Sequence, residues 1–152
     1  MLQYNHTSYT SRNNYIKQYN LDNKSIIDFG CGTKDVLNYI FPKEYLGIDI
    51  VSTADLIYDL DTLTFKTEAH YDVALMLGLL EWMKNPFEFV NSVKTVANRF
   101  IILFLFKDQK KQKWKQSFNQ IDVTNKLNNI FNFVEIKKYE QWSVYECKDV
   151  RL

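Results

Sequence analysis

The stretch that most constrains the fold is SIIDFGCGTKDVLNYI, residues 25 to 40, in which a short apolar run leads directly into two closely spaced glycines. An apolar run of this length, bounded by a glycine turn, predicts a buried strand over 25–29. After the turn, Val36, Leu37 and Ile40 share one helical face, which predicts a helix over 34–40 that ends before Pro42. A strand that turns at once into a helix is typical of α/β sheets.

The rest of the chain continues this alternation of apolar runs and amphipathic stretches. Helices are predicted over 85–98, with Asn85 as N-cap and Pro86 in the first turn, and around 119–130. Further strands are predicted over 45–50, 54–60, 71–77 and 99–106, and two more within 131–148, joined by a turn at Glu140 and Gln141. The predicted fold class is therefore α/β, a Rossmann-like, doubly wound sheet of seven strands, mostly parallel with a C-terminal antiparallel hairpin strand.

Length and composition predict one compact domain. The chain has 152 residues, of which 46% are hydrophobic, with only 4 Gly and 2 Pro, so no segment resembles a linker. We expect a single domain over 1–152, in which the N-terminal segment 1–24 covers the site. Two cysteines and two histidines form neither a disulfide framework nor a spaced set of metal ligands, so no metal is expected. No signal sequence or membrane-length apolar run is present, which favours a cytoplasmic protein without a membrane partner.

The glycine turn indicates what kind of ligand the domain binds. In open α/β sheets, ligands bind beyond the carboxyl ends of the strands, where Gly30 and Gly32 are expected to lie. The G-x-G-x-x-G spacing of dinucleotide sites would require glycine at 35, but Asp35 is there, and no G-x-x-x-x-G-K-[ST] phosphate loop can be written anywhere in the chain. The turn therefore favours a nucleoside whose charge is not a phosphate.

Acidic residues lie near the carboxyl ends of three of the predicted strands. Asp49 comes nineteen residues after Gly30, about where an acidic side chain accepts hydrogen bonds from ribose hydroxyls. Asp59 ends the third strand, on the side where an adenine would lie, and Asp28 is within the first strand. Asp28 either caps the turn or faces a cationic part of the ligand. Cys31 fits a small buried residue better than a nucleophile.

In order along the chain, these segments resemble the class I S-adenosylmethionine-dependent methyltransferases. IIDFGCGT is similar to the family's first motif, YLGIDI to its second, IYDLDTLTF to the segment that reaches the adenine, and YDVALMLGLLEWMKNP to its fourth-strand motif. The resemblance covers roughly residues 25–147 and implies S-adenosylmethionine as cofactor, with S-adenosylhomocysteine as product. The cofactor-binding residues that it implies are Asp28, Gly30, Cys31, Gly32, Asp49, Ile50, Asp59, Leu60 and Leu77.

The chain departs from the family pattern at two positions. Lys34 stands where the family usually has a third glycine, and Trp82 where a histidine commonly follows Leu-Glu. If Lys34 only crowds the cofactor, Lys34→Gly is expected to retain or improve binding. Glu81 and His6 are candidates for a catalytic base, and neither is assigned. The departures also leave open a non-catalytic subunit or a cofactor-sensing module with the same fold.

The resemblance implies in-line methyl transfer, and the short chain favours a small-molecule or glycan acceptor that presents a hydroxyl or an amine. The stretch 107–115 carries five lysines and a tryptophan after the fifth strand, which an anionic acceptor or RNA could use. A net charge of +1 disfavours nucleic acid as partner, because nucleic-acid binders usually have a clearly basic surface. An RNA methyltransferase is therefore the weaker alternative, and a protein partner is left open.

Overall fold

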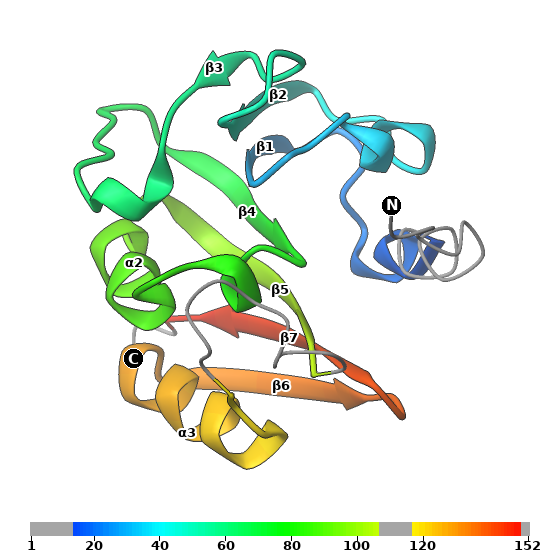
Figure 1. Cartoon of the computed structure of the whole chain (residues 1–152). Coiled ribbons are helices and arrows are strands. Elements are labelled where there is room, and N and C mark those ends of the chain that lie inside the picture. The colour runs from blue at the N-terminus through cyan, green and yellow to red at the C-terminus, as the bar shows by residue number, and fades with distance from the viewer. Residues whose placement is uncertain (1–13, 107–116, 150–152) are drawn as a thin grey trace, which may run out of the picture.

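The computed structural model describes residues 14–106 and 117–149, and these form a seven-stranded sheet with helices on both faces (Figure 1). The strand order is β3-β2-β1-β4-β5-β7-β6. Five strands are parallel and the last two pair antiparallel, as predicted. The strands are β1 Ser25–Phe29, β2 Glu44–Asp49, β3 Leu56–Ile57, β4 Tyr71–Leu77, β5 Ala97–Leu105, β6 Phe133–Lys138 and β7 Trp142–Lys148.

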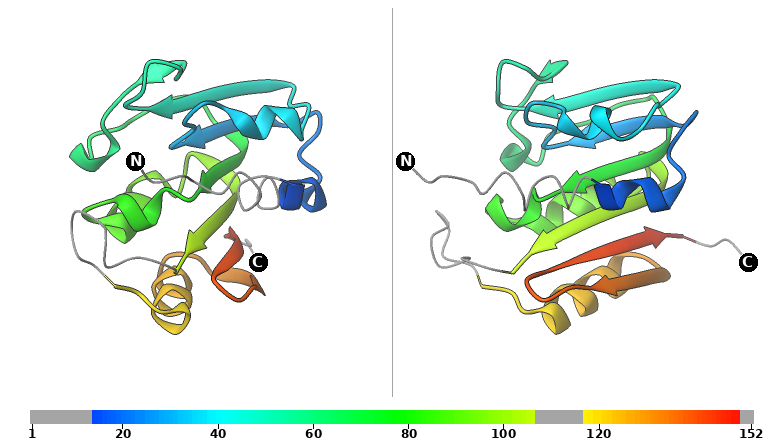
Figure 2. Two further views of the ribbon diagram at one scale, coloured as in Figure 1. Left: turned by 45° about the vertical axis from the view of Figure 1, so that its right-hand side comes forward. Right: turned by 90° about the vertical axis from the view of Figure 1, so that its right-hand side faces the viewer.

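The central strands are buried on both faces, which explains their nearly continuous apolar sequences. On one face, helices α2 (Pro86–Val93) and α3 (Gln120–Ile130) cover Phe29, Met76 and Phe104. Within the described ranges, the other face carries the short 3-10 helices η1 (Ile16–Tyr19) and η2 (Asp35–Asn38), which lie on the opposite side from α2 and α3 in the right-hand view of Figure 2. The residues that form this second core are Ile16, Tyr19, Leu21, Ile26, Val36, Ile40, Val73, Leu75, Ile101, Leu103 and Val144.

Helix α3 confirms the prediction over 119–130. Asn119 is its N-cap and accepts a 2.8 Å hydrogen bond from the backbone N–H of Asp122, while the Asp122 carboxylate accepts from the N–H of Asn119. Helix α2 begins at Pro86, as predicted, but it ends at Val93 and not at 98, because β5 already starts at Ala97. None of the helices in the described ranges is long and apolar enough to cross a membrane.

The two elements that flank the glycine turn are shorter than predicted. The helix predicted over 34–40 is the single 3-10 turn η2, because Lys34 is in the left-handed conformation (φ 62°) and Pro42 limits the other end. The strand predicted over 54–60 pairs only at Leu56 and Ile57. It ends there because the Asp59 carboxylate accepts a 3.0 Å bond from the N–H of Asp61 and starts the 3-10 helix η3 (Leu60–Thr62).

Candidate functional site

The glycine turn begins where β1 ends and packs closely against Ile48 of β2 and Leu79 after β4. The backbone N–H groups of Gly30 and Cys31 both donate to the carbonyl of Ile48, at 2.8 and 3.2 Å. Gly30 has φ 74°, and a Cβ atom there would lie 2.8 Å from Cδ1 of Leu79. Gly32 has φ 51°, but a Cβ atom there would meet nothing within 4 Å. The turn is therefore packed at Gly30 and open at Gly32, where a ligand can approach the backbone.

Asp49, at the carboxyl end of β2, is held by two backbone groups. Its Oδ2 accepts a 2.9 Å hydrogen bond from the N–H of Gly32, and its Oδ1 accepts a 2.6 Å bond from the N–H of Ile50. The carboxylate is only partly buried. Because an ionised carboxylate has about four acceptor positions, Asp49 can still accept two further hydrogen bonds from a ligand.

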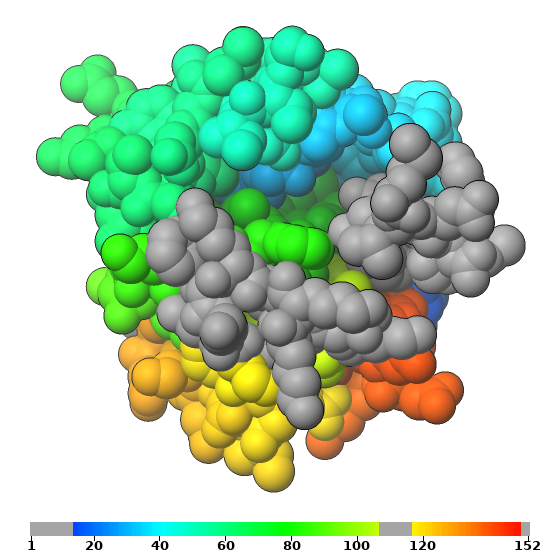
Figure 3. Space-filling view, in the orientation of Figure 1, coloured from blue at the N-terminus to red at the C-terminus, as the bar shows by residue number. Residues whose placement is uncertain are grey.

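Asp49 lies at the edge of a cavity of about 310 Å³. In Figure 3 a hollow separates the teal atoms of the segment after β2 from the bright green atoms that follow β4. The cavity is lined by Gly30, Gly32, Asp49, Ile50, Tyr58, Asp59, Leu60, Asp61, Leu77, Gly78, Leu79, Trp82 and Met83. One wall comes from residues 49–61 and the other from residues 77–83, so the two halves of the sheet meet here. We call it the large cavity, to distinguish it from the narrow pocket beside it.

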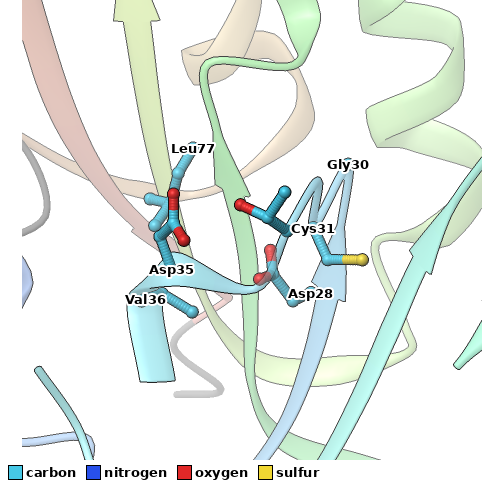
Figure 4. Close-up of a pocket in the computed structure, with 7 residues that line it drawn as sticks. Asp28, Gly30, Cys31, Asp35, Val36 and Leu77 are labelled. Carbon is cyan, nitrogen blue, oxygen red and sulfur yellow. The ribbon is translucent and has the colours of Figure 1, made fainter. Parts of the chain in front are cut away.

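A second, narrow pocket of about 20 Å³ adjoins the large cavity, since Gly30 and Leu77 line both. Its other lining residues are Asp28, Cys31, Thr33, Asp35 and Val36. In Figure 4 the carboxylates of Asp28 and Asp35 point into the space between β1 and η2, while the sulfur of Cys31 points away from it. Among the described residues that line either pocket, none is a lysine or an arginine. Both pockets are therefore suited to neutral or cationic groups.

Asp28 is almost completely buried, with 3% of its surface exposed. Its Oδ2 accepts a 2.6 Å hydrogen bond from the hydroxyl of Tyr45 on β2. Burial raises the pKa of Asp28 to about 7; the Tyr45 bond lowers it and the charge of Asp49 adds to the increase. Burial also raises the pKa of Tyr45 far above its usual range, so Tyr45 remains the donor.

Cys31 packs against the backbone of β2. A Cβ atom at Gly47 would lie 2.8 Å from the Cys31 sulfur, so the absence of a side chain at Gly47 makes room for the thiol. Burial, together with the charges of Asp28 and Asp49, raises the pKa of Cys31 to about 12. The thiol therefore stays protonated near neutral pH and is a poor nucleophile.

All the cofactor-binding residues predicted from the sequence line one or both of the two pockets. The large cavity contains Gly32, Asp49, Ile50, Asp59 and Leu60, the narrow pocket contains Asp28 and Cys31, and Gly30 and Leu77 line both. The alternation of strand and turn predicted this grouping, because the carboxyl ends of parallel strands share one edge of the sheet.

Other residues of the site were not predicted. Tyr58, Asp61, Gly78, Leu79 and Met83 also line the large cavity. Trp82, already noted in the sequence as a departure from the family pattern at the end of the fourth strand, lines it too and is 49% exposed. A signal for several of them was present in the sequence, since Gly78 to Met83 directly follow a strand that ends at the binding edge. Asp61, only two residues after Asp59, accepts a 2.9 Å bond from the N–H of Lys84 and thereby joins the two walls.

Neither candidate base is among the described residues that line the two pockets. Glu81, within the 3-10 helix η4 (Leu80–Trp82), is buried and is not among the described residues that line the large cavity. His6 and the lysine-rich stretch 107–115 lie outside the described residues. Within the described ranges, no group of three or more His, Cys, Asp or Glu side chains could hold a metal ion.

A family comparison identifies the type of domain. The sequence profile of a family described as a methyltransferase domain matches residues 1–143. The chain belongs to this methyltransferase family. The sequence-based assignment to the class I S-adenosylmethionine-dependent methyltransferases, and the predicted fold class, are thereby confirmed. No curated protein is similar enough in sequence to match.

Solved structures share the fold of this methyltransferase at low sequence identity. One is the 1,6-didemethyltoxoflavin-N1-methyltransferase of Burkholderia thailandensis, with 1,6-didemethyltoxoflavin and S-adenosylhomocysteine bound (TM-score 0.72, 11% identity, 97% of this chain and 80% of that chain). Another is the magnesium protoporphyrin IX methyltransferase of Synechocystis PCC 6803 with S-adenosylmethionine bound (0.64, 13%, 99% and 86%). A third is the N-terminal domain of EvdMO1 in the presence of S-adenosylhomocysteine and D-fucose (0.69, 13%, 98% and 85%).

Proposed function

We propose that this methyltransferase transfers the methyl group of S-adenosylmethionine to a hydroxyl or an amine of a small-molecule or glycan acceptor. The observation that carries the proposal is the Asp49 carboxylate, fixed by the N–H groups of Gly32 and Ile50 at the edge of the large cavity. A fixed carboxylate with free acceptor positions is suited to two adjacent ribose hydroxyls. We therefore assign Asp49 to the ribose.

The large cavity has the chemistry that the adenosine part of the cofactor requires. Ile50, Leu60 and Met83 supply apolar contacts for a flat base, and Trp82 adds an aromatic surface. Asp59 accepts from the Asp61 N–H through Oδ1, and as a carboxylate it has further acceptor positions for an exocyclic amino group. The described lining offers no lysine or arginine for a phosphate, which supports a nucleoside and disfavours a dinucleotide.

The narrow pocket suits the amino-acid end of the cofactor. It has room for about one water-sized group, and two carboxylates, Asp28 and Asp35, face it. An ammonium group fits both the size and the charge. Because Gly30 and Leu77 line both pockets, the sulfonium, which joins the two ends of the cofactor, would lie beside them. The acceptor would then approach from the end of β4.

The chemistry requires little from the protein beyond alignment. S-adenosylmethionine, when bound, supplies a methyl group on a sulfonium that is already a good leaving group. The narrow pocket would hold the amino-acid end of the cofactor and the large cavity its adenosine, and the methyl group would thereby be oriented towards an acceptor, which is catalysis by proximity and orientation. A general base is needed only where the acceptor must lose its proton early in the reaction. We assign no residue to that role.

The acceptor class draws support from the solved structures that share the fold. Their names describe methyl transfer to 1,6-didemethyltoxoflavin and to magnesium protoporphyrin IX, and one was studied in the presence of D-fucose. All three are compact molecules. Since the sequence identities lie between 11% and 13%, these names support a class of acceptor and no single compound.

Calorimetric titration of the purified chain with S-adenosylmethionine and with S-adenosylhomocysteine tests the proposal, with NAD as control. We expect micromolar affinity for the first two ligands and none for NAD. Binding would justify a screen of acceptors by mass spectrometry for a gain of one methyl group. If a folded sample binds neither ligand, the non-catalytic alternative replaces the enzyme. Strongly salt-dependent binding of RNA would favour the RNA methyltransferase instead.

A further inference from the structure

Lys34, the residue that replaces a glycine of the family's first motif, forms an ion pair with Asp55 in the segment between β2 and β3. Lys34 adopts the left-handed backbone conformation, with φ 62° and ψ 32°, which glycine adopts more readily. A lysine in this conformation costs about 1 kcal/mol or more relative to glycine. The backbone geometry of the motif is thus kept, and the side chain gains a partner that glycine could not have.

Asp55 connects this ion pair to β2, the strand that ends in Asp49. Its Oδ2 accepts a 2.8 Å hydrogen bond from the N–H of Gly47, and its own N–H donates to the carbonyl of Gly47 at 2.9 Å. The bonds from Lys34 and from Gly47 hold the pKa of Asp55 below its usual range, so the carboxylate stays ionised. The pair is partly exposed, with 23% of the Lys34 side chain and 37% of the Asp55 side chain accessible.

Two further contacts join the same two segments on either side of Gly32. The hydroxyl of Thr53 donates to the carbonyl of Gly32 at 2.8 Å, and the N–H of Gly32 donates to Asp49 at 2.9 Å. The open residue of the glycine turn is therefore held through both its backbone polar groups by side chains of residues 49–53. The ion pair of Lys34 and Asp55 closes this set of contacts two residues further along each segment.

We propose that Lys34 is a positioning residue, whose ion pair with Asp55 holds residues 50–55 against the glycine turn and so keeps Asp49 oriented for the ribose. This inference rests on the proposed function and extends it to a residue that departs from the family pattern. It reverses the expectation from the sequence that Lys34→Gly would retain or improve binding, because the sequence does not reveal the partner. Lys34 is also committed to a carboxylate and is not free to attract a phosphate.

The test compares Lys34→Gly, Lys34→Met and Asp55→Asn with the unmodified chain, using calorimetry with S-adenosylhomocysteine and 5′-methylthioadenosine. The second ligand lacks the amino-acid end, so a defect at the ribose affects both ligands equally. We expect each variant to weaken both affinities about three- to tenfold, less than the loss of a hydrogen bond to the ligand itself, because the pair is partly exposed and acts only through Asp49. The double variant Lys34→Met with Asp55→Asn should be no weaker than either single variant, because the two residues act as a pair.

Thermal unfolding separates positioning from a general structural role. In Lys34→Gly the left-handed conformation of residue 34 is no longer strained, because glycine adopts it readily. This variant should therefore unfold at the same or a higher temperature than Lys34→Met, while both bind the ligands equally weakly. Exchanging the charges, Lys34→Asp with Asp55→Lys, should restore part of the affinity, since aspartate tolerates the left-handed conformation. Lys148→Met is the control, because Lys148 is also a partly exposed lysine (38%) that pairs with a carboxylate, Glu146, but on β7, towards the other end of the sheet from β2 and β3.

Amide hydrogen exchange provides a readout that needs no ligand. We expect faster exchange at Gly32 and Gly47 in Lys34→Met than in Lys148→Met. If Lys34→Gly binds both ligands as tightly as the unmodified chain, and the two amides exchange at unchanged rates, the positioning role is overturned while the proposed function stands. If the unmodified chain binds neither ligand, the proposed function fails first, and the positioning role fails with it.

Discussion

The hydroxyl of Tyr45 donates a 2.6 Å hydrogen bond to Oδ2 of Asp28, and this bond links β2 to β1 directly beside the narrow pocket. Each residue affects the pKa of the other: the Tyr45 bond lowers the pKa of Asp28, and Asp28 raises the pKa of Tyr45. Asp28 is buried, and its pKa is raised to about 7, so near neutral pH it is divided between the carboxylic acid and the carboxylate. The narrow pocket therefore changes its charge in the physiological range.

The free energy of unfolding should depend on pH through Asp28. Because the folded state holds this proton more tightly than the unfolded chain, the contribution of Asp28 is greatest below about pH 4 and is lost as the pH rises towards about 7. Asp28→Asn removes this dependence and keeps an oxygen that can accept the Tyr45 bond. Between about pH 5 and pH 7, the unmodified chain should lose about 2 kcal/mol relative to the variant. Urea unfolding across that range measures the difference, and parallel curves would contradict it.

Tyr45→Phe should raise the pKa of Asp28 further. The ring remains, but the hydrogen bond that favours the carboxylate is lost, so burial acts unopposed. The measurement is a carbon NMR titration of the Asp28 carboxyl group in both proteins, with the midpoint expected at higher pH in the variant. Tyr71→Phe is a suitable control, because Tyr71 starts β4 at the opposite edge of the sheet. An unchanged or lower midpoint would show that the Tyr45 hydroxyl does not stabilise the carboxylate.

Asp49→Ala should weaken the binding of S-adenosylhomocysteine by about a hundredfold or more, since two hydrogen bonds to an ionised carboxylate are lost and each contributes about 1.5–3 kcal/mol. The fold should persist, because the carboxylate is only partly buried and its partners are backbone groups next to open space. Calorimetry and circular dichroism on the same sample test both statements. Asp72→Ala is the control, since Asp72 also accepts from a backbone N–H, that of Ser25 at 2.8 Å, but far from both pockets. Equal affinity in Asp49→Ala would show that the ribose lies elsewhere.

The two glycines of the turn should respond differently to alanine. At Gly30 a Cβ atom would lie 2.8 Å from Leu79 on a backbone with φ 74°, so Gly30→Ala should lower the free energy of unfolding by about 2 kcal/mol or more. Gly32 has φ 51° but open space, so Gly32→Ala should cost only about 1 kcal/mol. Its main effect should be on cofactor affinity, because the new methyl group occupies the approach to the backbone. Thermal unfolding and calorimetry of both variants distinguish the two cases, and an equal loss of stability would contradict this account.

Much of the fold followed from local patterns in the sequence. The buried strands over 25–29 and 71–77, the capped helix after Asn119 and the turn at Glu140 and Gln141 were all predictable, because each depends on periodicity or on a terminal residue. The grouping of the acidic residues followed from the rule that parallel strands share their carboxyl edge. What local patterns cannot provide is the partner of a side chain across two segments.

Lys34 is the clearest case. From the sequence it was only a departure from glycine, whereas the structure pairs it with Asp55, twenty-one residues later. Tyr45 and Asp28 are seventeen residues apart and meet only because β1 and β2 pair in the register that places Asp28 opposite Gly47. The short η2 likewise depends on the conformation of one residue, Lys34, which the helical spacing of Val36, Leu37 and Ile40 does not reveal.

The large cavity has one wall from residues 49–61 and the other from residues 77–83, and the chain passes between these walls through the segment 62–76. A polypeptide cut within residues 66–70, after Phe65 and before β4, would therefore yield two fragments, each with one wall of the large cavity. If the large cavity binds adenosine as proposed, neither fragment alone would bind it, but the reassembled pair would. The ligand would then act as a reporter of fragment complementation, and its presence would favour the joined form over the separated pieces.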